Sequence, residues 1–268
     1  MDSRTIDGAQ AVARAAQILK LVSQRAQRGH ALAELVVESG LTRPTVYRLL
    51  SALQAAGLIE RDSKTDRWHL GDECRVLGTL AAHRFSIERL ARNCLLRIAG
   101  TTGESAFLSV RRGVESVCLI REEGTYPIRT HVLQAGDRLP LGVGSAGIAM
   151  LAALGDTEID ELMVQITPHL KRRFVNFTPQ RIKQFVAQTR ASGYATNKGL
   201  LLEGSWGVAA AVRDVAGAPI AALSITAIES RVQGARQVEL GRLLVREARS
   251  LGNLLMSESG ADPRRKVA

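Results

Sequence analysis

The amino-acid sequence predicts an α+β fold built from two domains that are joined by a helix. Three observations support this prediction. Apolar residues recur at helical spacing up to residue 57, a short hairpin pattern covers residues 58–70, and short strands interrupted by helical segments begin at residue 104. The 268 residues are enough for two hydrophobic cores. The predicted parts are an N-terminal domain at 1–71, a connecting helix at 72–86, a C-terminal domain at 87–258 and a disordered basic tail at 259–268.

The N-terminal domain is predicted to begin with two helices. Residues 9–28 carry small and aliphatic side chains on one helical stripe, and the glycine that follows breaks the helix. A short second helix over residues 31–39 has three aliphatic residues on one face. Gly40 ends this helix, because glycine accepts the left-handed conformation in which many helices stop.

The third helix is predicted to present polar side chains to the outside. Thr42 can cap its N-terminus, and Pro44 fits the first turn, where a missing N–H has no cost. Its apolar residues form one buried stripe, which consists of Val46, Leu49, Leu50 and Leu53. The opposite face consists of Pro44, Tyr47, Arg48 and Ser51, with Arg43 and Thr45 at the leading end.

A two-stranded hairpin is predicted after this helix. Residues 58–61 and 67–70 form the strands around the polar turn 62–66, and Lys64 and Arg67 are placed to reach phosphates. Two helices joined by a glycine-containing turn and followed by such a hairpin form a winged helix-turn-helix, which suits a reader of the DNA major groove. The alternative is a plain packing unit in which Arg48 is merely solvated.

The segment from Thr42 to Leu50, with Leu53, Gly57 and a hairpin that closes on Gly71, closely resembles the DNA-binding domain of IclR-type (isocitrate lyase regulator) bacterial transcription factors. The resemblance covers the chain except for its two tails. It implies a ligand-responsive regulator of a catabolic operon that binds a palindromic operator in double-stranded DNA as a homodimer or homotetramer. The residues predicted to contact DNA are Thr42, Arg43, Pro44, Thr45, Tyr47, Arg48, Ser51, Lys64 and Arg67.

Two further helices are predicted before the strands begin. The first covers residues 73–85 and carries the apolar residues Val76, Leu77, Leu80 and Ala81. The second begins near Ser86 and ends at Gly100 or Gly103. In IclR-like proteins the first of these helices connects the domains and helps to pair two subunits.

The C-terminal domain is predicted to mix strands with helices. The predicted strands cover 105–110, 116–120, 128–133, 208–213 and 220–226. The predicted helices cover 146–154, 156–166, 179–192 with Thr178 as its cap, and 237–256. This order resembles the GAF-like effector-binding domain of the IclR family.

Residues 142–147 form a literal G-x-G-x-x-G motif that opens a helix, so a dinucleotide site is a candidate. The context argues against it, because the preceding residues 138–141 contain a proline and do not form a buried parallel strand. The acidic residues about twenty positions later, Asp160 and Glu161, lie in a helical pattern instead of at a strand end. Free N–H groups at a helix N-terminus still favour an anion or a carbonyl oxygen.

In IclR-like proteins this loop is one wall of an effector pocket. The matching positions here are Ile128, Leu139, Ser145, Ala146, Asn197, Gly207, Ser224 and Thr226. The alternative is that Ser224 and Thr226 are ordinary strand residues and that the glycines only permit close packing. Ile148 stands where many relatives carry lysine, so an anion contact from a lysine is not expected. Hydroxyl groups beside aliphatic walls suit a small organic acid, including an aromatic one.

Composition limits the remaining function classes. The formal charge of +10 is compatible with nucleic acid, but residues 1–70 hold only 10 Lys and Arg against 7 Asp and Glu, a net charge of +3. Three widely spaced cysteines are typical of reduced thiols in a cytoplasmic protein and predict neither disulfides nor a metal site. No apolar run reaches the roughly 20 residues of a membrane span, and the N-terminus lacks the apolar core of a signal peptide.

The second hypothesis from the sequence is a small-molecule enzyme with an N-terminal helical interaction module. The five histidines show no H-x-H or H-E-x-x-H spacing, and residues 204–207 lack the G-x-S-x-G elbow. No catalytic residue, metal or cofactor is therefore predicted. Contacts with RNA polymerase, and hence the choice between repression and activation, leave no motif in the sequence.

Overall fold

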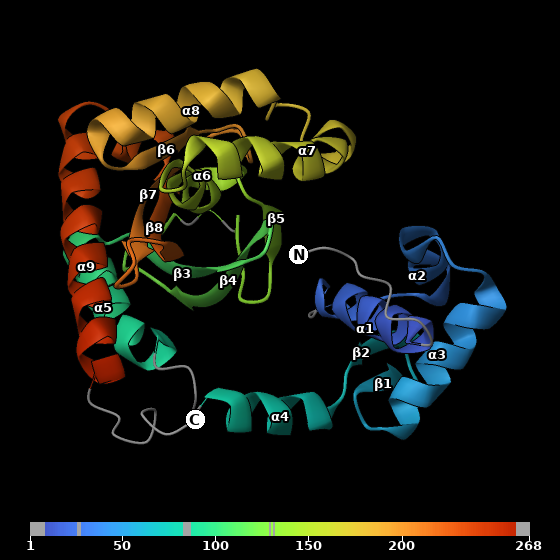
Figure 1. The fold of residues 1–268 in the computed structure, drawn as a ribbon. Helices are drawn as coiled ribbons and strands as arrows, with labels where there is room; N and C mark the ends of the chain where they lie inside the picture. The colour runs from blue at the N-terminus through green and yellow to red at the C-terminus, as the bar shows by residue number, and fades with distance from the viewer. Residues whose placement is uncertain (1–8, 26–27, 83–86, 129, 131, 261–268) are drawn as a thin grey trace. The chain divides into compact units, whose positions relative to one another are not determined.

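The structure is a computed structural model that describes residues 9–25, 28–82, 87–128, 130 and 132–260. The chain divides into two compact units, residues 1–85 and 86–268 (Figure 1). Each unit has its own hydrophobic core. Within the described residues, no helix is both long and apolar enough to cross a membrane.

The first unit is a winged helix-turn-helix, as predicted. Its elements are α1 (Gln10–Ser23), α2 (Leu32–Ser39), α3 (Arg43–Ala55), β1 (Ile59–Asp62), β2 (Arg67–Leu70) and α4 (Asp72–Ala82). Helix α1 ends five residues before the predicted end, and residues 26–27 of the predicted helix lie outside the described residues. Gly40 has a φ of 68° and ends α2 as expected.

A compact core holds α3 in place. Its fully buried members Ile18, Leu35, Val46 and Leu50 come from all three helices. Trp68 of the hairpin completes this core, and its backbone forms two hydrogen bonds with His30. The stripe predicted for α3 is therefore its buried face, with Leu49 partly buried at the margin.

The second unit contains a six-stranded antiparallel sheet in the order β5-β4-β3-β8-β7-β6. Its strands are β3 (Ser105–Arg112), β4 (Glu115–Glu122), β5 (Arg138–Pro140), β6 (Ala195–Lys198), β7 (Ser205–Arg213) and β8 (Pro219–Ile228). Its helices are α5 (Ile87–Thr102), α6 (Gly144–Ala152), α7 (Asp156–Arg173), α8 (Pro179–Ser192) and α9 (Ala235–Gly260), with a single 3-10 turn at Glu229–Arg231. Helices α5 and α9 pack on the sheet with apolar residues of one core, whereas α6, α7 and α8 belong to a second core on its other side (Figure 1).

The strand predicted at residues 128–133 is wrong for the residues of this range that the structure describes. Residues 129 and 131 lie outside them, and the others have no strand structure. The edge of β4 is taken instead by residues 136–140, because Gly136 donates to the Cys118 carbonyl and Cys118 donates to the Asp137 carbonyl. The chain also forms β6, which was not predicted. Pro140 fits β5 because this strand lies at the sheet edge.

Candidate functional site

Helix α3 exposes the polar face that the sequence predicts. Side chains of Arg43, Pro44, Tyr47, Arg48 and Ser51 are exposed, and Tyr47 has 52% of its surface accessible. Neither Tyr47 nor Arg48 is therefore drawn into the core of its own unit. Three buried residues on the opposite face pack the helix into the core. The core therefore fixes the position of the backbone that carries the exposed side chains.

The N-terminus of α3 differs in one detail from the prediction. Thr42 occupies the cap position, but its side chain accepts no hydrogen bond from the helix. Its hydroxyl oxygen lies 2.9 Å from that of Thr45, which is half-buried. The first turn therefore keeps N–H groups without a side-chain cap, and such groups favour phosphate oxygens.

A cleft of about 610 Å³ lies between α3 and the hairpin. Arg43, Pro44 and Tyr47 line it from the helix, and Arg61 lines it from β1. The guanidinium of Arg61 lies 5.7 Å from the ring centre of Trp68 and forms an ion pair with Asp66. Sequence reasoning missed Arg61, although a basic residue on a wing strand is a signal that could have identified it.

The two basic residues predicted on the wing lie in different surroundings. Lys64 is exposed in the turn, where its backbone N–H donates to Asp62 at 2.8 Å. Arg67 is half-buried and donates to the Gly29 carbonyl at 3.0 Å and to Glu34 at 3.2 Å. The Lys64 side chain is thus exposed to solvent, whereas Arg67 links the hairpin to Gly29 and to Glu34 of α2.

Glu34 of α2 is the centre of a charged network in the first unit. Its carboxylate accepts from the Ala31 N–H at 3.0 Å and pairs with Arg25 at 2.7 Å, Arg28 at 2.9 Å and Arg67. The Ala31 hydrogen bond and then the Arg25 charge lower the pKa of Glu34 to about 2. This network connects α2 to the residues after α1 and to β2.

We expect Glu34→Gln to destabilise the first unit at neutral pH. Because the folded-state pKa of Glu34 is depressed, its contribution is present above the ordinary carboxyl pKa and is lost as the pH falls towards about 2. Thermal unfolding at pH 7 should show a loss of about 1 kcal/mol, the scale of a helix-capping interaction. The difference between variant and parent should shrink at pH 3, and a pH-independent difference would contradict this account.

In the second unit, the two faces of the sheet differ in chemistry. The face toward α5 and α9 is lined by aliphatic residues and alanines of one core. The other face carries most of the buried polar side chains of the unit: Ser105, Ser109, Ser116, Asn197, Ser224 and Thr226. Burying hydroxyl and amide groups is costly unless they have partners, so their hydrogen bonds bear on whether this face can hold a polar ligand.

Strand register brings the predicted pocket residues together. Asn197 lies opposite Gly207, and Gly207 lies opposite Thr226, so the three form a row across β6, β7 and β8. Ser224 lies two residues from Thr226 on the same face. A Cβ atom on Gly207 would approach the Ser145 hydroxyl to 2.7 Å, so the start of α6 rests directly on this row.

Several of these polar groups have identified partners. Thr226 accepts a hydrogen bond from Thr130 at 3.2 Å, and Asn197 accepts one from the Leu200 N–H at 3.2 Å. The hydroxyl of Ser224 is buried and has no hydrogen-bond partner among the described residues. Such an unsatisfied hydroxyl is the kind of group that a bound molecule or a water can complete.

Two predicted pocket residues lie at the margins of this cluster. Leu139 lines a small cavity of about 10 Å³ together with Ser145 and Ala146, which is space for about one water molecule. Ile128 is 56% exposed, so the structure does not bring it into the buried cluster.

Backbone conformation explains the glycines of the loop before α6. The loop does not follow the kind of strand that a dinucleotide-binding site requires. Gly142 and Gly144 have φ values of 89° and 69°, which favour glycine. Helix α6 follows an antiparallel edge strand instead of a central parallel strand. Ile148, for which the sequence predicts no anion contact, is fully buried.

Sequence reasoning missed Arg121 of β4. In strand register Arg121 lies opposite Phe107, which lies opposite Ser224, so the guanidinium belongs to the polar face. Its side chain is 13% exposed and lies 3.1 Å from the carboxylate of Glu123, which is 48% exposed. A charged residue at an inward position of an apolar strand is the signal that could have identified it.

Cys118 and Asp137 lie beside the same face. Burial raises the pKa of the Cys118 thiol to about 12, and the nearby Asp137 charge adds to this effect. Burial also raises the pKa of Asp137, whose carboxylate accepts from the Gln134 N–H at 2.7 Å. The thiol is therefore a neutral lining group and not a nucleophile.

The chain resembles one family of known proteins over most of its length. Residues 11–63 match the model of the IclR helix-turn-helix domain, and residues 79–253 match the model of the bacterial transcriptional regulator IclR C-terminal domain. The HTH-type transcriptional repressor AllR of Escherichia coli (strain K12) is 28% identical over 254 residues, which are 92% of this chain and 91% of AllR. The HTH-type transcriptional regulator BhcR of Paracoccus denitrificans is 28% identical over 247 residues, 91% of this chain and 86% of BhcR.

Solved structures share the fold. An IclR transcriptional regulator from Alicyclobacillus acidocaldarius has a TM-score of 0.74 and 24% identity, covering 91% of this chain and 97% of that one. An IclR homolog from Microbacterium hydrocarbonoxydans, complexed with 4-hydroxybenzoate, has a TM-score of 0.70 and 20% identity, covering 91% of this chain and 98% of that one.

Proposed function

The chain belongs to the IclR family of bacterial transcriptional regulators and is a DNA-binding regulator, and from this premise we propose that a small organic anion controls its binding to a palindromic operator. The observation that carries the operator-binding part of the proposal is the exposed face of α3, with Arg43, Tyr47 and Arg48 opposite a fixed core. The relatives with matching domains are transcriptional regulators, so the enzyme hypothesis is not supported.

The proposed DNA contacts divide by their position. Arg48 and Tyr47 in the middle of α3 face the bases, whereas Arg43 at its start and Lys64 on the wing face phosphates. Arg61, at the cleft between helix and wing, is a further candidate for a phosphate contact. We propose a cytoplasmic location, because a bacterial transcriptional regulator has to reach the chromosome.

The proposed effector site is the polar face of the sheet beneath α6. The buried hydroxyl of Ser224 and the buried guanidinium of Arg121 favour a ligand with an oxygen-rich anionic group. The homolog complexed with 4-hydroxybenzoate supports an organic acid, aromatic acids included, as the class of effector. We propose that the regulated genes form a catabolic operon for such an acid.

The proposal is tested with DNA from the region upstream of the protein's own gene. Fluorescence anisotropy should show salt-dependent binding that is tighter than binding to a shuffled sequence. A panel of carboxylic acids should contain members that change this affinity, because an effector acts through its differential affinity for two states. Equal binding to both DNA sequences would reject the proposal.

We propose that α4 pairs two copies of the chain. Val76, Leu77 and Leu80 of α4 are exposed, with Leu80 at 62%, and they recur at helical spacing as one apolar stripe. A dimer would bury this stripe and present two reading helices to the two half-sites of a palindrome.

We expect the double substitution of Leu77→Glu and Leu80→Glu to weaken self-association, because four carboxylates would meet in the proposed interface of a dimer. Analytical ultracentrifugation should show dissociation at concentrations where the parent is oligomeric. Thr79→Glu adds a charge off the stripe and should leave the oligomer intact. The assignment of α4 fails if all three proteins sediment alike.

A further inference from the structure

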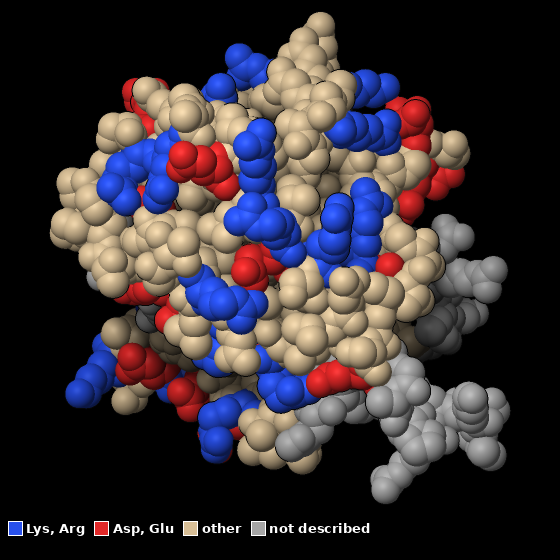
Figure 2. Space-filling view, turned by 90° about the vertical axis from the view of Figure 1, so that its left-hand side faces the viewer, with Lys and Arg blue, Asp and Glu red and all other residues tan. Residues whose placement is uncertain are grey.

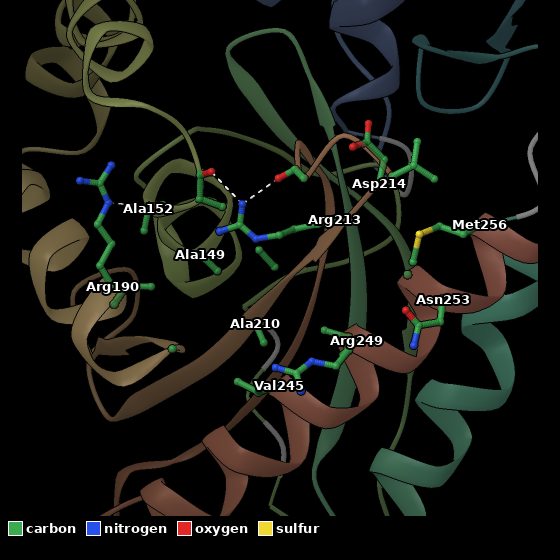
Figure 3. A pocket seen from close by; sticks show the side chains of 18 residues that line it. Ala149, Ala152, Arg190, Ala210, Arg213, Asp214, Val245, Arg249, Asn253 and Met256 are labelled. Carbon is green, nitrogen blue, oxygen red and sulfur yellow. Dashed lines mark hydrogen bonds between the residues drawn. The ribbon is translucent and has the colours of Figure 1, made fainter.

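A second cavity in the C-terminal unit lies apart from the proposed effector site. It has a volume of about 620 Å³ and is formed by the end of β7 with α6, α8 and α9 (Figure 3). None of the residues predicted for the effector pocket lines it. Its size falls within the range of small-molecule sites, roughly 300–1,000 Å³.

The cavity exists because the sheet is incomplete at this point. Strand β6 pairs with β7 only as far as Ala209, so residues 210–213 of β7 have no strand on that side within the described part of the chain. Small side chains, among them Ala149, Ala210 and Ala248, line the cavity and leave its interior open. The result is a hollow with apolar walls beside an exposed strand edge.

Three arginines from different elements lie around this hollow. Arg190 of α8 donates to the carbonyl of Ala152, the last residue of α6, at 3.0 Å and to that of Leu154 at 2.7 Å, and it pairs with Asp156. Arg213 of β7 donates to the Ala153 and Gly217 carbonyls through one nitrogen (Figure 3). These two guanidinium groups are fixed in place but keep further N–H groups.

Arg249 is different, because it is exposed and forms no hydrogen bond or ion pair with any residue that the structure describes. Asn253 lies one turn further along α9 and also lines the cavity (Figure 3). The acidic residue of the lining, Asp214, accepts the N–H groups of Ala216 and Ala218, both at 2.9 Å. The face shown in Figure 2 carries several groups of Lys and Arg side chains, with Asp and Glu side chains among them.

We propose that this cavity is a second ligand site, which binds an organic carboxylate with a compact apolar body. Arg249 would pair with the carboxylate, Asn253 would add a hydrogen bond, and the alanine walls would contact the body. The site has a physical route to the effector pocket. Helix α6 carries Ser145 in its first turn at that pocket and ends with Ala152 at this cavity.

The test uses methyl NMR of the full-length protein with labelled methionine. Among the four methionines of the chain, Met256 lines the cavity, whereas Met163 is buried in α7 and serves as the internal reference. The probes are cyclohexanecarboxylate and its neutral analogue cyclohexanecarboxamide, and Met256→Leu assigns the signal. We expect a saturable shift of the Met256 methyl with the carboxylate and binding about tenfold weaker with the amide.

Arg249→Gln should weaken carboxylate binding about tenfold and leave the amide unaffected, because only the charged partner is lost. Arg246→Gln is the matched control, since Arg246 is also exposed on α9 but does not line the cavity. The proposal is overturned by a Met256 signal that never saturates, or by equal losses in the two variants. It is also overturned if Arg249→Gln changes the sedimentation of the protein without changing ligand affinity, since the surface would then be an interface between copies.

Discussion

Arg48→Ala is expected to lower operator affinity by about 5- to 150-fold, which corresponds to the roughly 1–3 kcal/mol that a base-reading arginine contributes. Arg48 lies on the exposed face of α3, on the side opposite to Val46 and Leu50 of the core. Its removal therefore takes away a contact to DNA without opening a cavity in the protein. Affinity for unrelated DNA should change much less than affinity for the operator.

The measurement is fluorescence anisotropy at several fixed salt concentrations, with operator and shuffled DNA. Lys64→Ala is the matched control, because a phosphate contact from the wing should weaken binding to both DNA sequences alike. It should also reduce the slope of log affinity against log salt by about one. If Arg48→Ala retains the full preference for the operator, the recognition helix has been assigned incorrectly.

Arg121→Met is expected to remove most of the response to a carboxylate effector. The guanidinium lies on the polar face of the sheet, in one row with Phe107 and Ser224. Losing one partner of a buried charge pair costs about 2 kcal/mol or more, which is at least roughly 30-fold in affinity. Methionine preserves an unbranched apolar stem, so the packing of β4 should be disturbed little.

Calorimetry with benzoate, 4-hydroxybenzoate and the matching amides measures this effect. Arg121→Lys keeps the charge and should retain more affinity than Arg121→Met, although lysine lacks the forked geometry of arginine. The amides should bind all three proteins with similar affinity. Unchanged carboxylate affinity in Arg121→Met would show that the loop N–H groups before α6 supply the anion contact instead.

The sequence predicts best those elements whose ends are set by local chemistry. Helix α8 has the predicted bounds, because the Thr178 side chain accepts the Arg181 N–H and Gly193 takes a φ of 82° at its end. The reading helix and its hairpin follow the same rule, with Gly40 before them and a tight turn at Asp66. In each case the signal lies within a few residues of the boundary that it determines.

The errors concern features that depend on residues distant in the chain. The stretch 128–133 has a strand-like pattern, but the edge of β4 is occupied by residues 136–140. Arg67 looks like a wing residue, yet Glu34 holds it from 33 positions away. Arg121 has a local signal as a charged residue in an apolar strand, but its alignment with Ser224 follows only from strand register. The pairing of residues 136–140 with β4 and that of Arg67 with Glu34 have no local sequence signal.

The unequal faces of the C-terminal sheet have a consequence for how this protein can diversify. The contacts with α5 and α9 supply apolar burial that stabilises the scaffold, and they make no use of the hydroxyl and amide groups opposite. On the proposed assignment of this face to the effector site, exchanges among those polar side chains would change which metabolite is bound and would leave the apolar packing against α5 and α9 intact. Ligand preference and the main source of apolar burial would then be able to change independently of each other.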